Sequence, residues 1–234
     1  MLARHDLLWL SGEGWRQVRG AVPAEAVEAA AAGAAIARWR EADWPVIVRR
    51  ADADLGPDQV SVGIALPPCA EDGRKLRIAS RVALDAVRRR APPPPLARVA
   101  QCASMPPSWR ASLAALARDA DRQGTALRVY GSSALQALTG QAYLRDSSDI
   151  DLLVQPRAIV ELDAALGLLR THATTLPLDG EIVFPGGRAV AWKELLAARE
   201  GSPASRVLVK EMTRVSLVRF DALLALLEEA ACPN

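Results

Sequence analysis

Apolar positions in the second half of the chain follow two periods, which predict two kinds of element. Short apolar or alternating runs of period two predict strands at 126–130, 149–154, 178–184, 188–191, 206–210 and 215–218. Apolar residues at helical spacing predict helices at 109–122, 133–138, 157–170, 192–199 and 221–230. Strands that alternate with helices, with one hairpin around Pro185, predict an α/β layer on a mixed sheet.

The first ninety residues show a different pattern, with more strands than helices. Short apolar runs predict strands at 5–10, 46–50, 59–66 and 75–82. The alanine-rich segment 23–40 predicts one helix, because Pro23 stands near its start and acidic residues follow in the first turns. The run Arg88-Arg89-Arg90 is typical of an exposed helix end. Together these patterns predict a small β-rich domain.

A proline tract separates the two patterns. The segment APPPP at 91–95 cannot form a helix interior, and we interpret it as a stiff spacer. The sequence thus predicts an α+β protein with an N-terminal domain at 1–92, a Pro-rich linker at 93–108 and a second domain at 109–234.

Composition limits the possible classes of protein. The chain has 234 residues, half of them hydrophobic, and a net charge of +2 from 29 basic and 27 acidic residues, which gives no sign of a bulk nucleic-acid binder. Cys69, Cys102 and Cys232 have no metal-ligand spacing, so we expect reduced thiols. No apolar run approaches the ~18 residues of a membrane span or resembles a signal peptide, so we expect a soluble, cytoplasmic protein without a membrane partner.

The stretch 129–154 carries the candidate chemistry. Gly131 and Ser132 stand where a predicted strand ends and a predicted helix begins. The first backbone N–H groups of this helix and the positive end of its dipole suit a phosphate. Asp149 and Asp151 lie two residues apart on the next strand, so their carboxylates share one face. A divalent cation offsets the repulsion of such a pair, and oxygen ligands suit Mg²⁺. A phosphate cradle beside a carboxylate pair indicates attack at a phosphorus atom.

The order of these motifs resembles the nucleotidyltransferase superfamily, which has G-S followed by alternating apolar residues and aspartates. The longer strings GSSALQALTG, AYL and SSDIDLL resemble the malonate decarboxylase holo-acyl-carrier-protein synthases, also called phosphoribosyl-dephospho-CoA transferases. The stretches RHDLLWL, WPVIVRR and LDGEIVFPGGRAVAWKE extend the resemblance over nearly the whole chain. The interval from Ser132 to Asp149 is longer than is usual in the superfamily, and its extra segment, 139–148, matches the narrower family.

The resemblance implies a nucleotidyltransferase-like sheet and a specific reaction. The implied donor is triphosphoribosyl-dephospho-CoA, and the implied acceptor is a serine of the apo acyl-carrier subunit of malonate decarboxylase, with pyrophosphate released. Two Mg²⁺ ions would be held by Asp149, Asp151 and a third carboxylate on a neighbouring strand. Glu181, followed by Ile182, is favoured for the third position, and Asp179 on the same face is the competitor.

Phosphate-binding candidates lie in both predicted domains. The expected set comprises Gly131, Ser132, Ser133, Arg49, Arg50, Arg188, Lys193 and Lys210. Ser132 could instead be an ordinary helix cap. The arginines could be solvated surface residues, and the lysines could belong to structural salt bridges.

Three other functions are compatible with the sequence. The chain could be the equivalent transferase for citrate lyase, or another Mg²⁺-dependent nucleotidyltransferase that acts on a small molecule, while the near-neutral charge argues against RNA as the substrate. It could also be an inactive binding protein with this fold. An inactive binding protein would show no Mg²⁺-dependent thermal shift with a triphosphate ligand.

Overall fold

The computed structural model describes residues 2–22, 29–69, 71–202 and 205–231. The chain divides into two compact units. Unit 1 comprises residues 1–93 together with 141–143, and unit 2 comprises residues 94–140 and 144–234. The division falls one residue after the predicted end of the N-terminal domain at 92.

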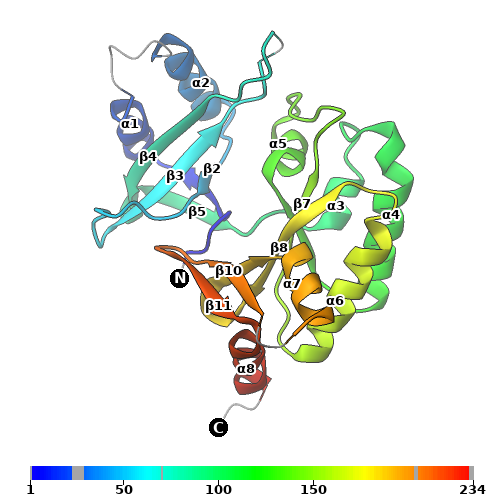
Figure 1. Ribbon diagram of the computed structural model, residues 1–234. Coiled ribbons are helices and arrows are strands. Elements are labelled where there is room, and N and C mark those ends of the chain that lie inside the picture. The colour runs from blue at the N-terminus through cyan, green and yellow to red at the C-terminus, as the bar shows by residue number, and fades with distance from the viewer. Residues whose placement is uncertain (1, 23–28, 70, 203–204, 232–234) are drawn as a thin grey trace. The chain divides into compact units, whose positions relative to one another are not determined.

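Unit 1 is built on an antiparallel sheet of five strands (Figure 1). The strand order is β4-β3-β2-β1-β5, from β1 (Leu7–Leu10), β2 (Val46–Val48), β3 (Gln59–Ala65), β4 (Arg77–Ala83) and β5 (Val87–Ala91). Among the described residues of unit 1, two helices accompany the sheet, α1 (Gly12–Gly20) and α2 (Ala29–Glu41), and a short 3-10 turn, Leu84–Ala86, precedes β5. Helix α1 was not expected from the sequence; Ser11 caps it by accepting the N–H of Gly14.

The triple-arginine run forms a strand, so the prediction of an exposed helix end was wrong. Strand β5 pairs with β1, and each arginine has a partner within unit 1. The guanidinium of Arg89 lies 3.6 Å from the centroid of the Trp9 ring, while Arg90 bonds the buried carboxylate of Asp6. Of the predicted helix at 23–40, the residues up to 28 lie outside the described residues.

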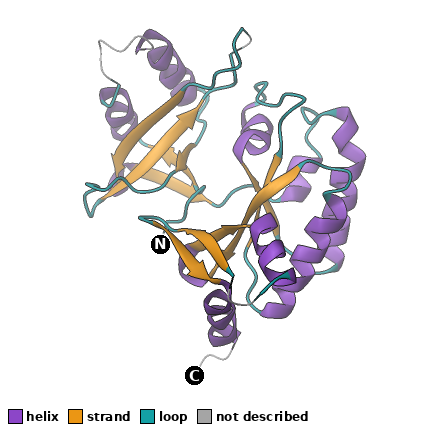
Figure 2. Cartoon of the chain, viewed as in Figure 1, coloured by secondary structure: helices purple, strands orange, loops and turns teal. Residues whose placement is uncertain are grey.

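Unit 2 contains a mixed sheet of six strands in the order β11-β10-β9-β8-β7-β6 (Figure 2). The strands are β6 (Leu127–Tyr130), β7 (Ile150–Val154), β8 (Leu178–Phe184), β9 (Arg188–Ala191), β10 (Arg206–Lys210) and β11 (Val215–Arg219). The helices are α3 (Leu96–Ala100), α4 (Pro107–Arg122), α5 (Gly131–Thr139), α6 (Ile159–His172), α7 (Trp192–Glu200) and α8 (Phe220–Ala231). Strands β7 and β8, which α6 connects, are the parallel pair, and every other pairing in this sheet is antiparallel.

One face of this sheet packs on the helices and forms the core of unit 2. Alternate strand residues such as Val129, Leu152 and Ile182 are fully buried with helix residues such as Leu116 and Leu162. The residues between them, which include Asp151, Asp179 and Glu181 of β7 and β8, therefore project from the opposite face.

The Pro-rich segment 93–108 is not a linker, contrary to the sequence prediction. From Pro94 onward it belongs to unit 2. Pro94 accepts a backbone bond from Val129, and Leu96, Val99 and Met105 are buried in the core. The prolines restrict the backbone at the start of the segment. The apolar residues that follow them are buried in the hydrophobic core of unit 2.

The chain passes between the units three times. Residues 141–143, inside the loop from α5 to β7, belong to unit 1, where the hydroxyl of Tyr143 donates to the backbone oxygen of Ala65 at 2.8 Å. Within the described residues, no helix has the length and apolar character needed to cross a membrane.

Candidate active site

The candidate site in unit 2 begins where β6 turns into α5. Tyr130 is the N-cap residue and provides no side-chain cap, and the first turn of the helix contains no acidic residue. Gly131, the first helical residue, has φ of +66°, a conformation that favours glycine. The start of α5 thus keeps the features of an anion site. Ser132 lies inside the helix, so it is not the N-cap residue that the sequence allowed.

Three carboxylates gather beside this helix start. Asp149 directly precedes β7, Asp151 lies within it, and Asp179 lies in β8, with ligand oxygens of all three within 4.8 Å of one another. Asp149 has no ion-pair or hydrogen-bond partner among the described residues. Oxygens on opposite sides of one Mg²⁺ are about 4.2 Å apart. Small side-chain adjustments would therefore bring this all-oxygen set to the size that a hard divalent cation needs.

The strand register decides which acidic residue of β8 joins the pair. In the parallel pairing of β7 and β8, Asp151 stands beside Asp179, whereas Glu181 stands beside Leu153. Glu181 is 4 % exposed, and its carboxylate accepts a bond from the ammonium of Lys210 at 3.0 Å. The sequence favoured Glu181 over Asp179 as the third carboxylate. The structure reverses this preference, because Asp179 lies with Asp149 and Asp151 and Glu181 does not.

Two glycines permit the close packing of the site. A Cβ atom at Gly131 would lie 2.1 Å from Oδ2 of Asp151, so that carboxylate rests against the start of α5. Gly180, between Asp179 and Glu181, has φ of +127°, and a Cβ atom there would lie 2.0 Å from the backbone oxygen of Leu152. A side chain at position 180 would push β8 away from β7.

The serines at the start of α5 differ in their surroundings. Ser133 is 2 % exposed, and its hydroxyl has no hydrogen-bond partner among the described residues. Ser132 is half-buried and has a polar contact of its own. Of the two, Ser133 is therefore the one with an unused hydrogen-bonding group at the helix start.

The expected phosphate-binding cations of unit 2 all have acidic neighbours. The ammonium of Lys193 lies 3.6 Å from Asp179, while Lys210 is paired with Glu181. The guanidinium of Arg188 lies 3.5 Å from Glu211. Lys193 is thus the cation directly beside the carboxylate cluster, and its exposed side chain leaves it free to turn toward a bound anion.

In unit 1, Arg49 and Arg50 have different environments. Arg49 donates two hydrogen bonds to the carboxylate of Asp52, at 2.6 and 2.5 Å, and a third to the backbone oxygen of Val62. Arg50 is exposed, and its side chain has no partner among the described residues. Arg49 therefore has a structural role within unit 1, and Arg50 is the arginine available to an external anion.

Replacing Asp52 with asparagine should flatten the acid side of the pH–stability profile. Hydrogen bonds, first from Arg49 and then from Arg81 and Ser61, hold the pKa of the Asp52 carboxyl far below its ordinary value. A depressed folded-state pKa stabilises the fold at pH values above the unfolded pKa of about 3.9, and this contribution is lost as the pH falls through and below that value. Urea unfolding between about pH 5 and pH 2 measures the difference.

The matched control for that measurement is Asp58→Asn, because Asp58 is exposed and its side chain has no partner among the described residues. The control should keep the wild-type profile. An Asp52→Asn protein that loses stability with acid as steeply as the wild type would contradict the prediction.

Comparisons with known proteins cover nearly the whole chain. The family model described as phosphoribosyl-dephospho-CoA transferase MdcG N-terminal domain matches residues 3–93, and the corresponding C-terminal domain model matches residues 95–221. A protein of Bradyrhizobium diazoefficiens named phosphoribosyl-dephospho-CoA transferase is 37% identical over 217 residues, which are 92% of this chain and 89% of that protein. A protein of the same name from Xanthomonas campestris pv. campestris is 35% identical over 225 residues, 95% of this chain and 97% of that protein. No solved structure matches the chain.

Proposed function

Because the chain belongs to the phosphoribosyl-dephospho-CoA transferase family, we propose that it attaches a prosthetic group to a carrier protein. The donor is 2′-(5″-triphosphoribosyl)-3′-dephospho-CoA, and the acceptor is a serine of the apo acyl-carrier subunit of malonate decarboxylase. The observation that carries the proposal is the cluster of Asp149, Asp151 and Asp179 at the start of α5. We further propose that unit 2 is nucleotidyltransferase-like, which the G-S motif at the start of α5 and the D-x-D motif at the start of β7 support.

In the proposed reaction, the serine oxygen bonds to the α-phosphorus of the donor and the bond to the pyrophosphate oxygen breaks. The N–H groups at the start of α5 bind phosphate oxygens, with the Ser133 hydroxyl as a further donor. The carboxylates orient the reacting groups and accept the proton of the hydroxyl. Lys193, beside Asp179, is placed to compensate the charge of the departing pyrophosphate.

We propose Mg²⁺ as the cation that the carboxylates hold. The cluster consists of oxygen donors only, and the exposed carboxylate of Asp149 leaves room for water ligands. Such an ion, when bound, lowers the pKa of the attacking hydroxyl and neutralises charge on the phosphates.

The direct test is intact-mass analysis of the apo carrier subunit after incubation with this protein, Mg²⁺ and the donor. The expected result is a mass increase equal to the phosphoribosyl-dephospho-CoA group, with release of pyrophosphate. The carrier of citrate lyase and a donor replaced by ATP or CTP are the comparison reactions. Modification of the citrate lyase carrier alone, or transfer from ATP or CTP alone, would overturn the proposal.

Asp179→Asn should impair transfer far more than Glu181→Gln. The first substitution removes a carboxylate from the cluster, whereas the second removes the partner of Lys210 at a position beside Leu153. We expect a loss of about a hundredfold for Asp179→Asn, and a loss of about tenfold or less for Glu181→Gln. Initial rates at several Mg²⁺ concentrations measure both losses. A larger loss for Glu181→Gln than for Asp179→Asn would instead make Glu181 the third carboxylate of the site.

Unit 1 is our candidate for contact with the acidic partner. Carrier proteins are acidic around the modified serine, and an interface of opposite charge favours encounter with them. Arg50 is exposed and has no partner among the described residues, so it is the better placed of the two arginines expected from the sequence.

A further inference from the structure

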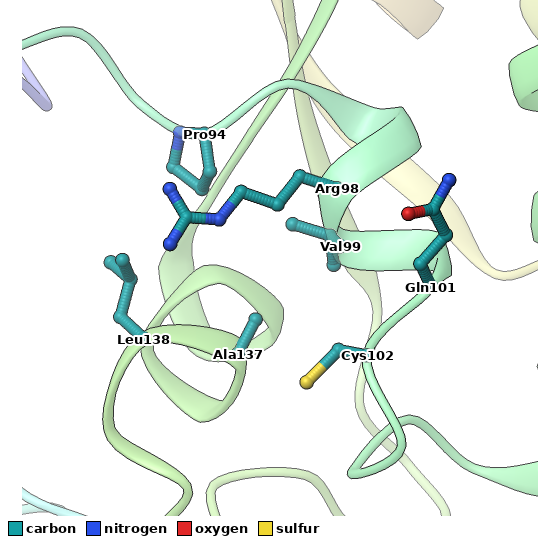
Figure 3. A pocket seen from close by; sticks show the side chains of 7 residues that line it. All are labelled: Pro94, Arg98, Val99, Gln101, Cys102, Ala137 and Leu138. Atoms are coloured by element: carbon teal, nitrogen blue, oxygen red, sulfur yellow. The ribbon is translucent and has the colours of Figure 1, made fainter.

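A pocket in unit 2 lies between α3 and α5, outside the carboxylate cluster (Figure 3). Its volume is about 150 Å³. It is lined by Pro94, Arg98, Val99, Gln101, Cys102, Ala137 and Leu138. Pockets for whole drug-sized ligands begin at about 300 Å³, so this one suits a single ring system of a larger molecule.

Polar and apolar groups share the lining of the pocket, with the polar side chains of Arg98 and Gln101 beside apolar ones such as Val99 and Leu138. Figure 3 shows the guanidinium of Arg98 between Pro94 and Leu138, with Gln101 on the far side of Val99. Neither the Arg98 nor the Gln101 side chain has an ion-pair or hydrogen-bond partner within the part of the chain that the structure describes. A small pocket that combines apolar side chains with an unused guanidinium and an unused amide is suited to a heteroaromatic base.

We propose that this pocket binds the adenine base of the donor, an inference that rests on the proposed function. The side chain of glutamine offers one donor and one acceptor, which match the N6 amino group and N7 of adenine. The guanidinium of Arg98 stacks on the face of the base, and Val99, Ala137 and Leu138 contact its apolar surface.

The position of the pocket along α5 agrees with the shape of the donor. Ala137 and Leu138 follow Gly131 by six and seven residues, which at a rise of about 1.5 Å per residue is about 10 Å along the helix. In the donor, one ribosyl group separates the reacting phosphate chain from the adenosine. A phosphate at the start of α5 and a base beside the last turn of the same helix are therefore compatible with one bound donor.

Two other parts of the donor fit the pocket less well. The pantetheine arm is long and carries several amides, whereas the pocket is compact and has a single amide side chain at its rim. A phosphate group would meet a single cationic side chain in this pocket, Arg98, with Val99, Ala137 and Leu138 beside it.

The test measures binding by calorimetry to the full-length protein, with 3′-dephospho-CoA, ADP, GDP and pantetheine 4′-phosphate as separate probes. The pocket variants are Arg98→Met, which keeps the bulk without the charge, and Ala137→Phe, which fills the space. Arg118→Met is the matched control, because Arg118 is exposed on α4 and its side chain has no partner among the described residues. Circular dichroism checks the fold of each variant.

We expect dephospho-CoA and ADP to bind, with affinities about tenfold lower in both pocket variants, the scale of one stacking contact to a base. The control should bind as the wild type does. ADP should bind about tenfold more tightly than GDP, and Gln101→Leu should remove this preference. ADP should also slow the alkylation of Cys102 and leave that of the exposed Cys69 unchanged.

Four results would overturn the inference. They are wild-type affinity for ADP in Arg98→Met, competition by pantetheine 4′-phosphate at this pocket, equal protection of Cys69 and Cys102, and no binding of ADP or dephospho-CoA to the wild type. If Ala137→Phe fails to fold, Arg98→Met still decides. Failure of the proposed function is distinguishable, because the carrier mass would then not increase even though adenine binding at this pocket persists.

Discussion

Replacing Asp151 with asparagine is expected to lower the rate of transfer by about a thousandfold, equivalent to about 4 kcal/mol of transition-state stabilisation. Asp151 is the central member of the cluster, since it stands beside Asp179 in the strand register and two residues from Asp149. Its carboxylate also rests against Gly131, where the donor phosphates are proposed to bind. Asparagine keeps the shape of the side chain and removes the charge that is proposed to hold a cation.

The fold should survive this substitution, because removing one of three like charges relieves repulsion within the cluster. Single-turnover mass analysis of the carrier measures the rate, and thermal unfolding checks the fold. Asp146→Asn is the matched control, since Asp146 is exposed in the loop that precedes β7 and lies outside the cluster. A well-folded Asp151→Asn protein with near-normal turnover would exclude the proposed chemistry at this site.

The largest expected effect on stability comes from Gly180→Ala. The added Cβ atom would lie within 2.0 to 2.7 Å of the backbone of Leu152, and φ of +127° is strained for any other residue. Overpacking and backbone strain together should lower the free energy of unfolding by about 3 kcal/mol or more. Denaturant unfolding monitored by circular dichroism measures this loss.

Gly167→Ala is the matched control for that measurement. Gly167 lies inside α6, and a Cβ atom there would have no neighbour within 4 Å. Because alanine favours the helix, this substitution should raise the free energy of unfolding by about 0.5–1 kcal/mol. If alanine at position 180 were tolerated as well as at 167, the close contact between β7 and β8 would not be a constraint on the site.

The sequence predicts the elements of unit 2 well because their signals are local. Period-two and helical patterns depend on neighbours in the chain, and the predicted strand at 178–184 agrees with β8. The choice between Asp179 and Glu181 is not local. Both residues share a face, so alternation cannot separate them, and the register with β7 decides between them.

Contacts between distant segments explain the other errors. The arginines at 88–90 resemble a solvated helix end because their partners, such as Asp6, are far away in the chain, 84 residues in the case of Arg90. The segment after Pro94 resembles a spacer because its prolines dominate the local pattern, while the core that buries Leu96 comes from later elements. The pocket beside α5 has no sequence signal, since Arg98 and Ala137 meet only in the folded unit.

The segment between Ser132 and Asp149 has a consequence for the design of chimaeras between relatives. Its residues 141–143 fold with unit 1, so the segment that precedes the carboxylate strand also supplies Tyr143 to the other unit. A chimaera made by exchanging residues 1–93 between two relatives would contain the strand of Ala65 from one protein and Tyr143 from the other. An exchange that includes residues 141–143 as well transfers both partners together, so a chimaera that keeps this contact must exchange two separate segments of the sequence.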